Sequence, residues 1–257
     1  MLLRRITKHV TEQNWFAVFI DFLIVVVGVF IGIQVANWNE TRKDDAQEKD
    51  YLISLHEDFV ANADGIQRDN NFHQQQLDDQ SVVIDSLTEC KVKPEHEMLF
   101  QRGINQLGYI NPPRFMRRTL NEMTASGNLD IIKNEAIRDH IAQMIFNVEF
   151  RDGVSDAVMR TTEHYRYIVE ENIQYDVKTP LEDSFSSSLA VIYDINKLCE
   201  NPKIASAVSA ISLTTRERIS AYNELLEMYQ AFLPMLEMES FNRWQYKIEP
   251  NGETQRF

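Results

Sequence analysis

One stretch near the start of the chain is almost wholly apolar. Residues 15–33 are apolar apart from Asp21, and Gln34 follows them. Trp15 and Trp38 bracket the stretch and stand 23 residues apart. That spacing is about 35 Å of helix, slightly more than the ~30 Å hydrocarbon thickness of a bilayer. Because Trp favours both membrane interfaces, the pattern predicts a transmembrane helix over residues 14–38.

A cleaved signal peptide is the alternative interpretation of the apolar stretch. Signal cleavage needs small residues at positions −1 and −3 before the cut. Ala36 could occupy position −1, but Gln34 would then occupy position −3, where it fits poorly. The sequence therefore favours an uncleaved anchor.

Residues 1–13 alternate apolar and basic positions at helical spacing, with Leu2, Leu3, Ile6 and Val10 between Arg4, Arg5 and Lys8. This predicts a short amphipathic helix on an anionic leaflet. Three basic residues precede the span, and three follow it within a dozen residues. The tighter clustering before the span favours a cytoplasmic N-terminus. In a bacterium, the chain would be anchored in the inner membrane with its C-terminal domain in the periplasm.

The apolar helix has no predicted stop where it leaves the membrane. No Pro occurs before Pro94, and no Gly lies between Gly32 and Gly65. The first apolar stripe beyond the span follows helical spacing and consists of Leu52, Leu55, Phe59, Ala63 and Ile66. The transmembrane helix is therefore expected to continue to about Thr88.

Helical patterns also dominate the rest of the chain. Loops are expected at 108–113, where Pro112-Pro113 excludes a helix, and at 179–188. Asn134 and Asn201-Pro202 are typical helix starts. Helices are expected at 95–107, 114–124, 135–171 and 202–232, with a kink or restart at Pro234. The predicted fold is all-α: one N-terminal transmembrane helix continuing into an antiparallel helical bundle over residues 39–244, with a tail at 245–257.

Composition supports helices and limits the possible partners. The 257 residues include only 8 Gly and 7 Pro, fewer turn residues than an all-β domain would need. The net charge is −13, of which residues 1–38 contribute +1, so the remainder carries −14. Such a surface repels nucleic acid, whose binding requires neutralising phosphates. The expected partners are the lipid bilayer and, through the transmembrane helix, a second copy or another membrane protein.

One face of the predicted span carries a packing pattern. Asp21, Gly28 and Gly32 are separated by 7 and 4 residues and fall within about 40° of one another. The GxxxG formed by Gly28 and Gly32 lets two helices approach closely. Three roles for Asp21 stay open: a boundary residue that reaches the interface, a partner for a polar group on another helix, or an ion-carrying carboxyl.

The two cysteines, Cys90 and Cys199, form no CxxC or zinc pattern. Outside the cytoplasm they could form one disulfide; two separately buried thiols are the alternative.

The sequence offers no motif for catalysis or cofactor binding. GxSxG, HExxH, Walker and Rossmann patterns are all missing, so we expect no enzyme activity, no cofactor and no metal site. A basic cluster beside the Pro-Pro loop consists of Arg114, Arg117 and Arg118. It could hold an anion, although a solvated face paired with acidic neighbours is the simpler interpretation.

Two resemblances bear on function. The run Phe19 to Val27, with one Asp among apolar residues, resembles the membrane helix of ExbD, TolR and MotB. Those proteins imply that Asp21 couples ion flow to work inside a larger complex. The rest of the chain does not resemble their compact domains.

The second resemblance covers more of the chain. The run Val26 to Glu40, which ends in Asn-Trp-Asn-Glu, resembles the start of a broad bacterial family of single-pass proteins catalogued as a domain of unknown function. Ser126-Gly127-Asn128-Leu129, running into Ile132-Lys133-Asn134, is similar to that family's second recurring stretch. The resemblance implies an architecture and no activity. The sequence therefore predicts a non-catalytic, membrane-anchored periplasmic interaction or sensory module; the alternative is an ion-coupled single-span subunit using Asp21.

Overall fold

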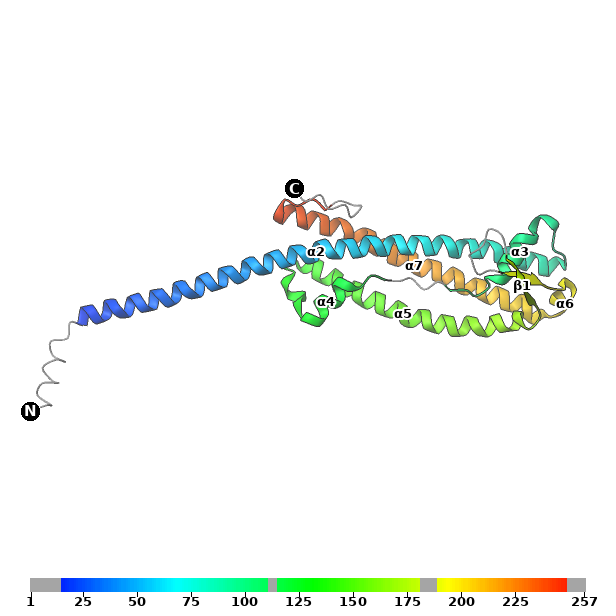
Figure 1. Ribbon diagram of the computed structural model, residues 1–257, viewed down its shortest axis with the longest axis horizontal. Coiled ribbons are helices and arrows are strands. Elements are labelled where there is room, and N and C mark those ends of the chain that lie inside the picture. The colour runs from blue at the N-terminus through cyan, green and yellow to red at the C-terminus, as the bar shows by residue number, and fades with distance from the viewer. Residues whose placement is uncertain (1–14, 111–114, 181–188, 249–257) are drawn as a thin grey trace, which may run out of the picture. The chain divides into compact units, whose positions relative to one another are not determined.

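The computed structural model describes residues 15–110, 115–180 and 189–248, and the chain divides into two compact units between Asp50 and Tyr51. Figure 1 shows the order of the elements. Their bounds are α2 Trp15–Glu89, η1 Pro94–His96, α3 Glu97–Asn105, α4 Arg118–Ser126, η2 Asn128–Ile131, α5 Glu135–Glu170, β1 Gln174–Pro180, β2 Leu189–Ile192, α6 Ile195–Glu200 and α7 Pro202–Trp244. The expected all-α fold is confirmed, with one small two-stranded sheet.

Unit 1, where the structure describes it, is the first part of α2. Its large apolar side chains are exposed, including Phe22 at 65% and Phe30 at 61%. Among the described residues, α2 is the one helix long and apolar enough to cross a membrane. The predicted continuation without a break is also confirmed, because α2 runs on to Glu89.

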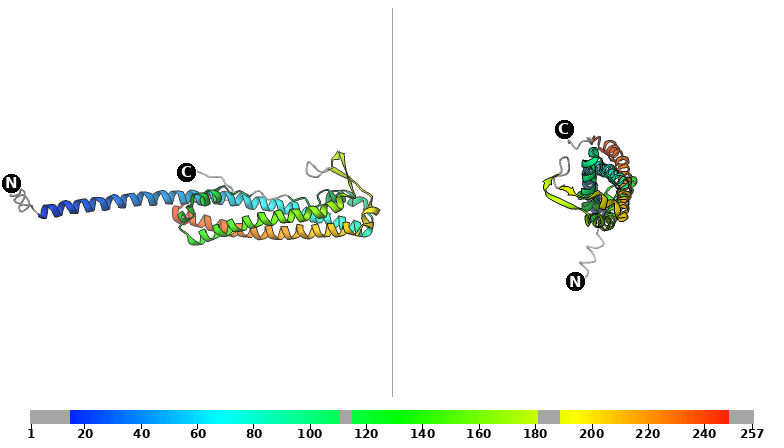
Figure 2. Two further views of the ribbon diagram at one scale, coloured as in Figure 1. Left: turned by 90° about the horizontal axis from the view of Figure 1, so that it is seen from below. Right: turned by 90° about the vertical axis from the view of Figure 1, so that its right-hand side faces the viewer.

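Unit 2 is built on the second part of α2, along which α7 runs in the opposite direction (Figures 1 and 2). His56 Nε2 lies 2.9 Å from Glu237 Oε1, near the end of α7. Further along α2, Asn70 donates to Asn223 at 2.8 Å. Residue numbers therefore increase along α2 while those of the contacting residues decrease along α7, so the two helices are antiparallel.

The third long helix, α5, is also antiparallel to α7. Asn134, just before α5, contacts Glu239 at 2.8 Å, and Arg151 contacts Glu224 at 3.4 Å. In unit 2, α2 and α5 therefore run in the same direction. The loop predicted at 108–113 from Pro112-Pro113 falls between α3 and α4, and its residues 111–113 lie outside the described ranges.

Two apolar clusters fill the interior of unit 2. The first contains Phe59 of α2, whose ring centroid lies 5.1 Å from that of Tyr229 and 5.5 Å from that of Phe232. The second lies around the end of α2, α3 and the start of α7, and includes Val83, Phe100 and Val208. Each cluster joins helices that are far apart in the sequence.

The small sheet was not predicted. Sequence patterns indicated a loop over 179–188, but β1 extends to Pro180 and pairs antiparallel with β2; residues 181–188 lie outside the described ranges. Side chains of α3 bind β2: Gln101 accepts from the Val191 N–H at 3.0 Å, and Asn105 donates to the Leu189 carbonyl at 2.7 Å. These bonds to α3 help to order β2, whose four residues are too few to be recognised as a strand from the sequence.

Some predicted boundaries were wrong. Helix α7 continues through Pro234 to Trp244 instead of ending near Phe232. Proline inside a helix costs about 3 kcal/mol, but Phe232 and Leu236 on either side are fully buried in the first cluster and stabilise the helix there. Helix α4 begins at Arg118 rather than at residue 114.

The predicted helix caps are confirmed. The Asn134 side chain accepts from the N–H groups of Ala136 and Ile137, and Asn201 accepts from Lys203 N. Gly127 ends α4 at φ 69°, a conformation that a side chain disfavours.

We expect Phe59→Ala to lower the free energy of unfolding by about 3–5 kcal/mol, because it leaves a cavity beside two aromatic rings. Phe241→Ala is the matched control, since Phe241 is 51% exposed on α7, and should lower the free energy of unfolding by only about 1 kcal/mol. Urea unfolding of the full chain in detergent, followed by circular dichroism, measures both. Equal effects would contradict the assignment of Phe59 to the core.

Candidate functional site

A layer of polar residues on α2 separates the two apolar clusters. Between Ile66 and Val83 the buried side chains of α2 are polar, with Phe72 as the exception. We call them the polar layer: Asp69, Asn70, His73, Gln76, Asp79 and Gln80. Burying polar groups costs free energy unless they are paired. A polar layer inside a helical bundle is therefore a candidate functional feature.

The polar layer binds three other parts of unit 2. Asp79 accepts two hydrogen bonds from Arg102 of α3, at 2.6 and 2.8 Å. The Gln76 amide donates to the carbonyls of Gln106 and Tyr109, both at 3.0 Å. Together with the Asn70 contact to α7, these bonds fix the positions along α2 at which α3, α7 and the chain after α3 contact it.

Two more buried polar residues of α2 precede the polar layer and extend it into a row towards the start of unit 2. Asn62 accepts from the N–H of Met116 at 2.6 Å and donates to its carbonyl at 3.0 Å. Asp58 accepts from the N–H and hydroxyl of Thr119, at 3.0 and 2.7 Å. Its carboxylate thus stabilises the first turn of α4, whose own N-cap residue makes no side-chain bond.

Sequence reasoning missed this row, although a signal was present. Asp58, Asn62, Asp69, His73 and Gln76 recur at intervals of 4, 7, 4 and 3 residues, which places them on one face of a helix. That face borders the apolar stripe. A polar row at this spacing is usually solvated, and only the packed structure shows that it points inward.

A cleft opens between α5 and α7 at the level of the polar layer. Its volume is about 220 Å³. The walls are mainly apolar, and the lining residues are Phe150, Arg151, Val154, Ser155, Val158, Thr214, Glu217, Arg218, Ala221 and Tyr222. Phe150 is 60% exposed at the cleft and stacks on Phe146, with ring centroids 6.1 Å apart. Exposed aromatic rings beside a concave surface are typical of binding sites.

The buried charge of the cleft is Arg218. Its guanidinium lies over the ring of Tyr222, 5.1 Å from the centroid, and it interacts electrostatically with Asp69 of the polar layer. Burial lowers the pKa of Arg218, while Tyr222 and Asp69 act in the opposite direction. Arginine stays protonated at neutral pH under such conditions. The cleft therefore contains a positive charge largely removed from solvent.

A second, smaller cavity of about 10 Å³ adjoins the cleft. It shares Val158, Thr214 and Arg218 with the cleft, and His73 of the polar layer lines it. A space of this size holds about one water molecule. Gly108 forms part of the wall at φ +69°, and a Cβ there would lie 2.7 Å from Thr162 Cγ2, so only glycine fits.

The hydrogen bonds of Gln76 place a proton on His73 Nδ1. Because the Gln76 amide nitrogen donates to two carbonyls, its Oε1 is the atom that faces His73 Nδ1, at 2.7 Å. An amide oxygen only accepts, so Nδ1 is the donor of this hydrogen bond. Within the described ranges no group of three or more His, Cys, Asp or Glu side chains is placed to hold a metal ion.

The predicted membrane residues all lie on α2. Gly28 and Gly32 have open space where a Cβ would stand. Trp38 is 61% exposed, and the Arg42 guanidinium lies 5.2 Å from its ring centroid. The side chains of Trp15 and Asp21 lie outside what the structure describes.

Two members of the predicted basic cluster, Arg117 and Arg118, lie among the described residues. Arg114 lies outside the described ranges. Arg118 Nη2 lies 3.8 Å from Asp58 Oδ1, and the Arg117 guanidinium lies 5.8 Å from the ring centroid of Phe115. One of these guanidiniums therefore faces a carboxylate and another faces an aromatic ring.

Cys90 and Cys199 form a disulfide, with Cα atoms 5.6 Å apart. Cys90 directly follows α2, and Cys199 lies in α6, just before α7. The bond therefore links the end of α2 to the start of α7.

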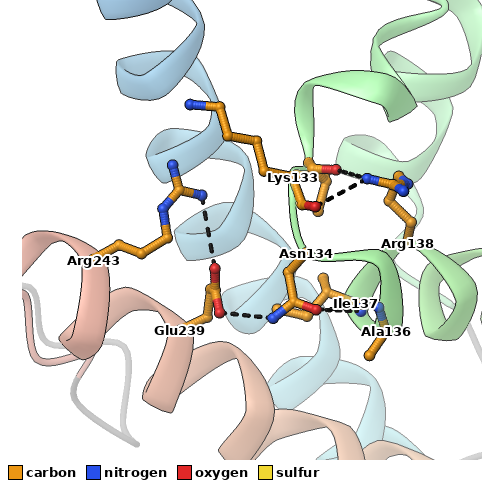
Figure 3. A network of polar contacts seen from close by, with 8 residues as sticks. Lys133, Asn134, Ala136, Ile137, Arg138, Glu239 and Arg243 are labelled. Carbon is orange, nitrogen blue, oxygen red and sulfur yellow. Dashed lines mark hydrogen bonds and ion pairs between the residues drawn. The ribbon is translucent and has the colours of Figure 1, made fainter.

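The stretch 126–134, which carries the second sequence resemblance, connects α4 to α5. Figure 3 shows Asn134 at its end: the side chain caps α5 and donates to Glu239 of α7 at 2.8 Å. Arg138 donates to the carbonyls of Ile132 and Lys133, at 2.5 and 3.2 Å. Asn128 donates to the Tyr51 hydroxyl at 3.1 Å. These residues fix the start of α5 against α7 and α2.

Comparison with known proteins gives a family and no further relative. A family model described as a family of unknown function, DUF6090, matches residues 21–192. The matched stretch includes the polar layer and the α5 wall of the cleft, while the α7 wall lies beyond it. No curated protein matches the chain, and no solved structure does.

Asn134→Ala should lower the free energy of unfolding by about 1–2 kcal/mol, because it removes a helix cap and a bond to Glu239 together. Asn147→Ala is the control, since Asn147 lies within α5 and bonds only its own helix at Gln143. Urea unfolding of both variants measures the difference. If Asn134→Ala is as stable as the control, the network of Figure 3 contributes nothing.

Proposed function

The chain belongs to the DUF6090 family, whose function is unknown, and we propose that it is a membrane-anchored receptor without catalytic activity. In this proposal a single span lies in the inner membrane of a bacterium, and the helical domain lies in the periplasm. The domain binds a ligand or partner, and the span associates with a second copy or another membrane protein.

The observation that carries the proposal is the continuity of α2. One helix contains the exposed apolar stretch, the buried polar layer and one side of both apolar clusters. A helix transmits a displacement along its length more directly than a flexible linker does. Any change in unit 2 that shifts the polar layer acts on the same helix that contains the span.

Two features support the periplasmic location. Lys and Arg cluster before the span, as is typical of a cytoplasmic N-terminus. The disulfide between Cys90 and Cys199 is of a kind that persists in oxidising compartments and is rare in the cytosol.

Association through the span is supported by Gly28 and Gly32. Because a Cβ at either position would meet nothing within 4 Å, larger side chains fit the isolated chain without a clash. An effect of such side chains would therefore report contact with another helix. The double variant Gly28→Ile and Gly32→Ile is a direct test.

We expect the wild-type protein, tagged and gently extracted at native expression level, to be a homodimer or a complex with one partner. The double glycine variant should be recovered mainly as a single chain, because branched side chains keep two helices apart. Native mass spectrometry measures the mass. Val26→Leu is the control, because Val26 is 48% exposed and lies more than 100° from both glycines around the helix, and it should leave the mass unchanged.

Two outcomes would contradict the proposal that the chain is a receptor without catalytic activity. A stoichiometric multi-span partner surrounding the span, with loss of function in Asp21→Asn while assembly survives, would favour the ion-coupled subunit. A hydrolytic or transferase activity of the purified chain would replace the receptor with an enzyme.

The location can be tested through the cysteines. In cells whose outer membrane is permeabilised, an impermeant thiol reagent should modify neither Cys90 nor Cys199 until an impermeant reductant is added, and then both. The reason is that the disulfide shields both thiols on the periplasmic side. Modification only after lysis, without any reductant, would place the domain in the cytoplasm.

A further inference from the structure

We propose that the cleft between α5 and α7 binds a small molecule with an apolar, aromatic-sized body and one carboxylate group. This inference rests on the proposed function, because it names the ligand class that the receptor would bind. It concerns unit 2 alone.

The apolar walls define the body of the ligand. Phe150, Val154 and Val158 of α5 line one side, and Ala221 of α7 lines the other. The volume of about 220 Å³ is below the roughly 300–1,000 Å³ of sites for drug-sized ligands. One or two fused rings are therefore the largest body that fits.

Arg218 defines the charged group. It is 9% exposed and lines both the cleft and the small cavity that adjoins it. A guanidinium has five N–H donors in a planar fork, so it can bind Tyr222 and Asp69 and still donate to a carboxylate. In a cleft with mainly apolar walls, this attraction is stronger than it would be in water.

Two hydroxyl groups also line the cleft beside Arg218. Ser155 Oγ of the α5 wall lies 3.4 Å from the Tyr222 hydroxyl, and either oxygen could be the donor. Each hydroxyl can donate to or accept from a ligand in the cleft.

The cleft lining contains Arg151, Arg218 and one acidic residue, Glu217. Arg151 is paired with Glu224 at 3.4 Å and Arg218 interacts with Asp69, so net charge alone does not select an anion. Discrimination between a carboxylate and an ammonium therefore depends on short-range hydrogen bonds to Arg218, because residues 51–257 as a whole have 20 basic and 32 acidic side chains.

A ligand in this position would lie beside the polar layer. Arg218 interacts with Asp69, and His73 lines the cavity that shares Arg218 with the cleft. A carboxylate that draws Arg218 towards α5 weakens its interaction with α2. Binding would thus alter the contacts of the helix that continues into the span.

Three probes of one shape test the ligand class: 2-naphthoate, 2-naphthalenemethanol and protonated 2-naphthylmethylamine. Isothermal titration calorimetry uses the full chain in lipid nanodiscs, with empty nanodiscs as the blank. We expect the carboxylate to bind at least about tenfold more tightly than the ammonium, as charge-assisted hydrogen bonds to a buried guanidinium require. The alcohol should fall between them.

Variants locate the site. Arg218→Met should weaken naphthoate binding about tenfold and leave the alcohol within about threefold. Arg216→Met is the matched control, because Arg216 is exposed on the same helix outside the cleft. Val154→Glu changes a residue that is 43% exposed, so it leaves the buried contacts intact. It should reverse the order of carboxylate and ammonium, and Val154→Gln should not.

Each outcome decides the ligand class. The proposed ligand class is supported if the preference for the carboxylate disappears in Arg218→Met or reverses in Val154→Glu. Binding of the alcohol or the ammonium as tightly as the carboxylate overturns the ligand class, and so does a complete lack of binding by all three probes. Neither result affects the assembly and location experiments, which test the receptor itself.

Discussion

Buried polar side chains along α2 hydrogen-bond other parts of unit 2, and these bonds determine where those parts lie along the helix. Asp58 hydrogen-bonds the first turn of α4, Asn62 hydrogen-bonds Met116, and Gln76 hydrogen-bonds the chain that follows α3. Asp79 binds α3 itself through Arg102. Each partner fits at one position along the helix, so α2 fixes both the order and the level of the elements around it.

Apolar packing alone would not give this precision. Replacing buried polar pairs by well-packed apolar residues is often neutral or stabilising, and a continuous apolar stripe allows several registers of one helix along another. Here the polar layer divides the core in two, and the cleft opens at the same level through Arg218. The buried polar groups thus lie at the level where the cleft opens to a ligand.

The long helices could be predicted because their signals are local. Apolar periodicity, Asn134 and Asn201 each act within a few residues, and the structure has helix starts where the two asparagines predict them. The polar row could not be recognised as buried, because its partners lie tens of residues away. The cleft depends on how two remote helices pack, and the β hairpin depends on contacts with α3. The disulfide needs two cysteines 109 residues apart to meet, which the sequence leaves open.

The disulfide has a consequence for the covalent connectivity of the chain. It closes a loop of 109 residues that contains α3, α4, α5 and the hairpin. Closing a loop of about this length removes unfolded-state entropy worth roughly 4–5 kcal/mol in the chain-entropy account. It also makes the two parts of the chain inseparable by a single peptide-bond cleavage inside the loop. After such a cut, the fragment with α7 stays attached to the fragment with the span, so the α7 wall of the cleft is not shed from the anchor until the bridge is reduced.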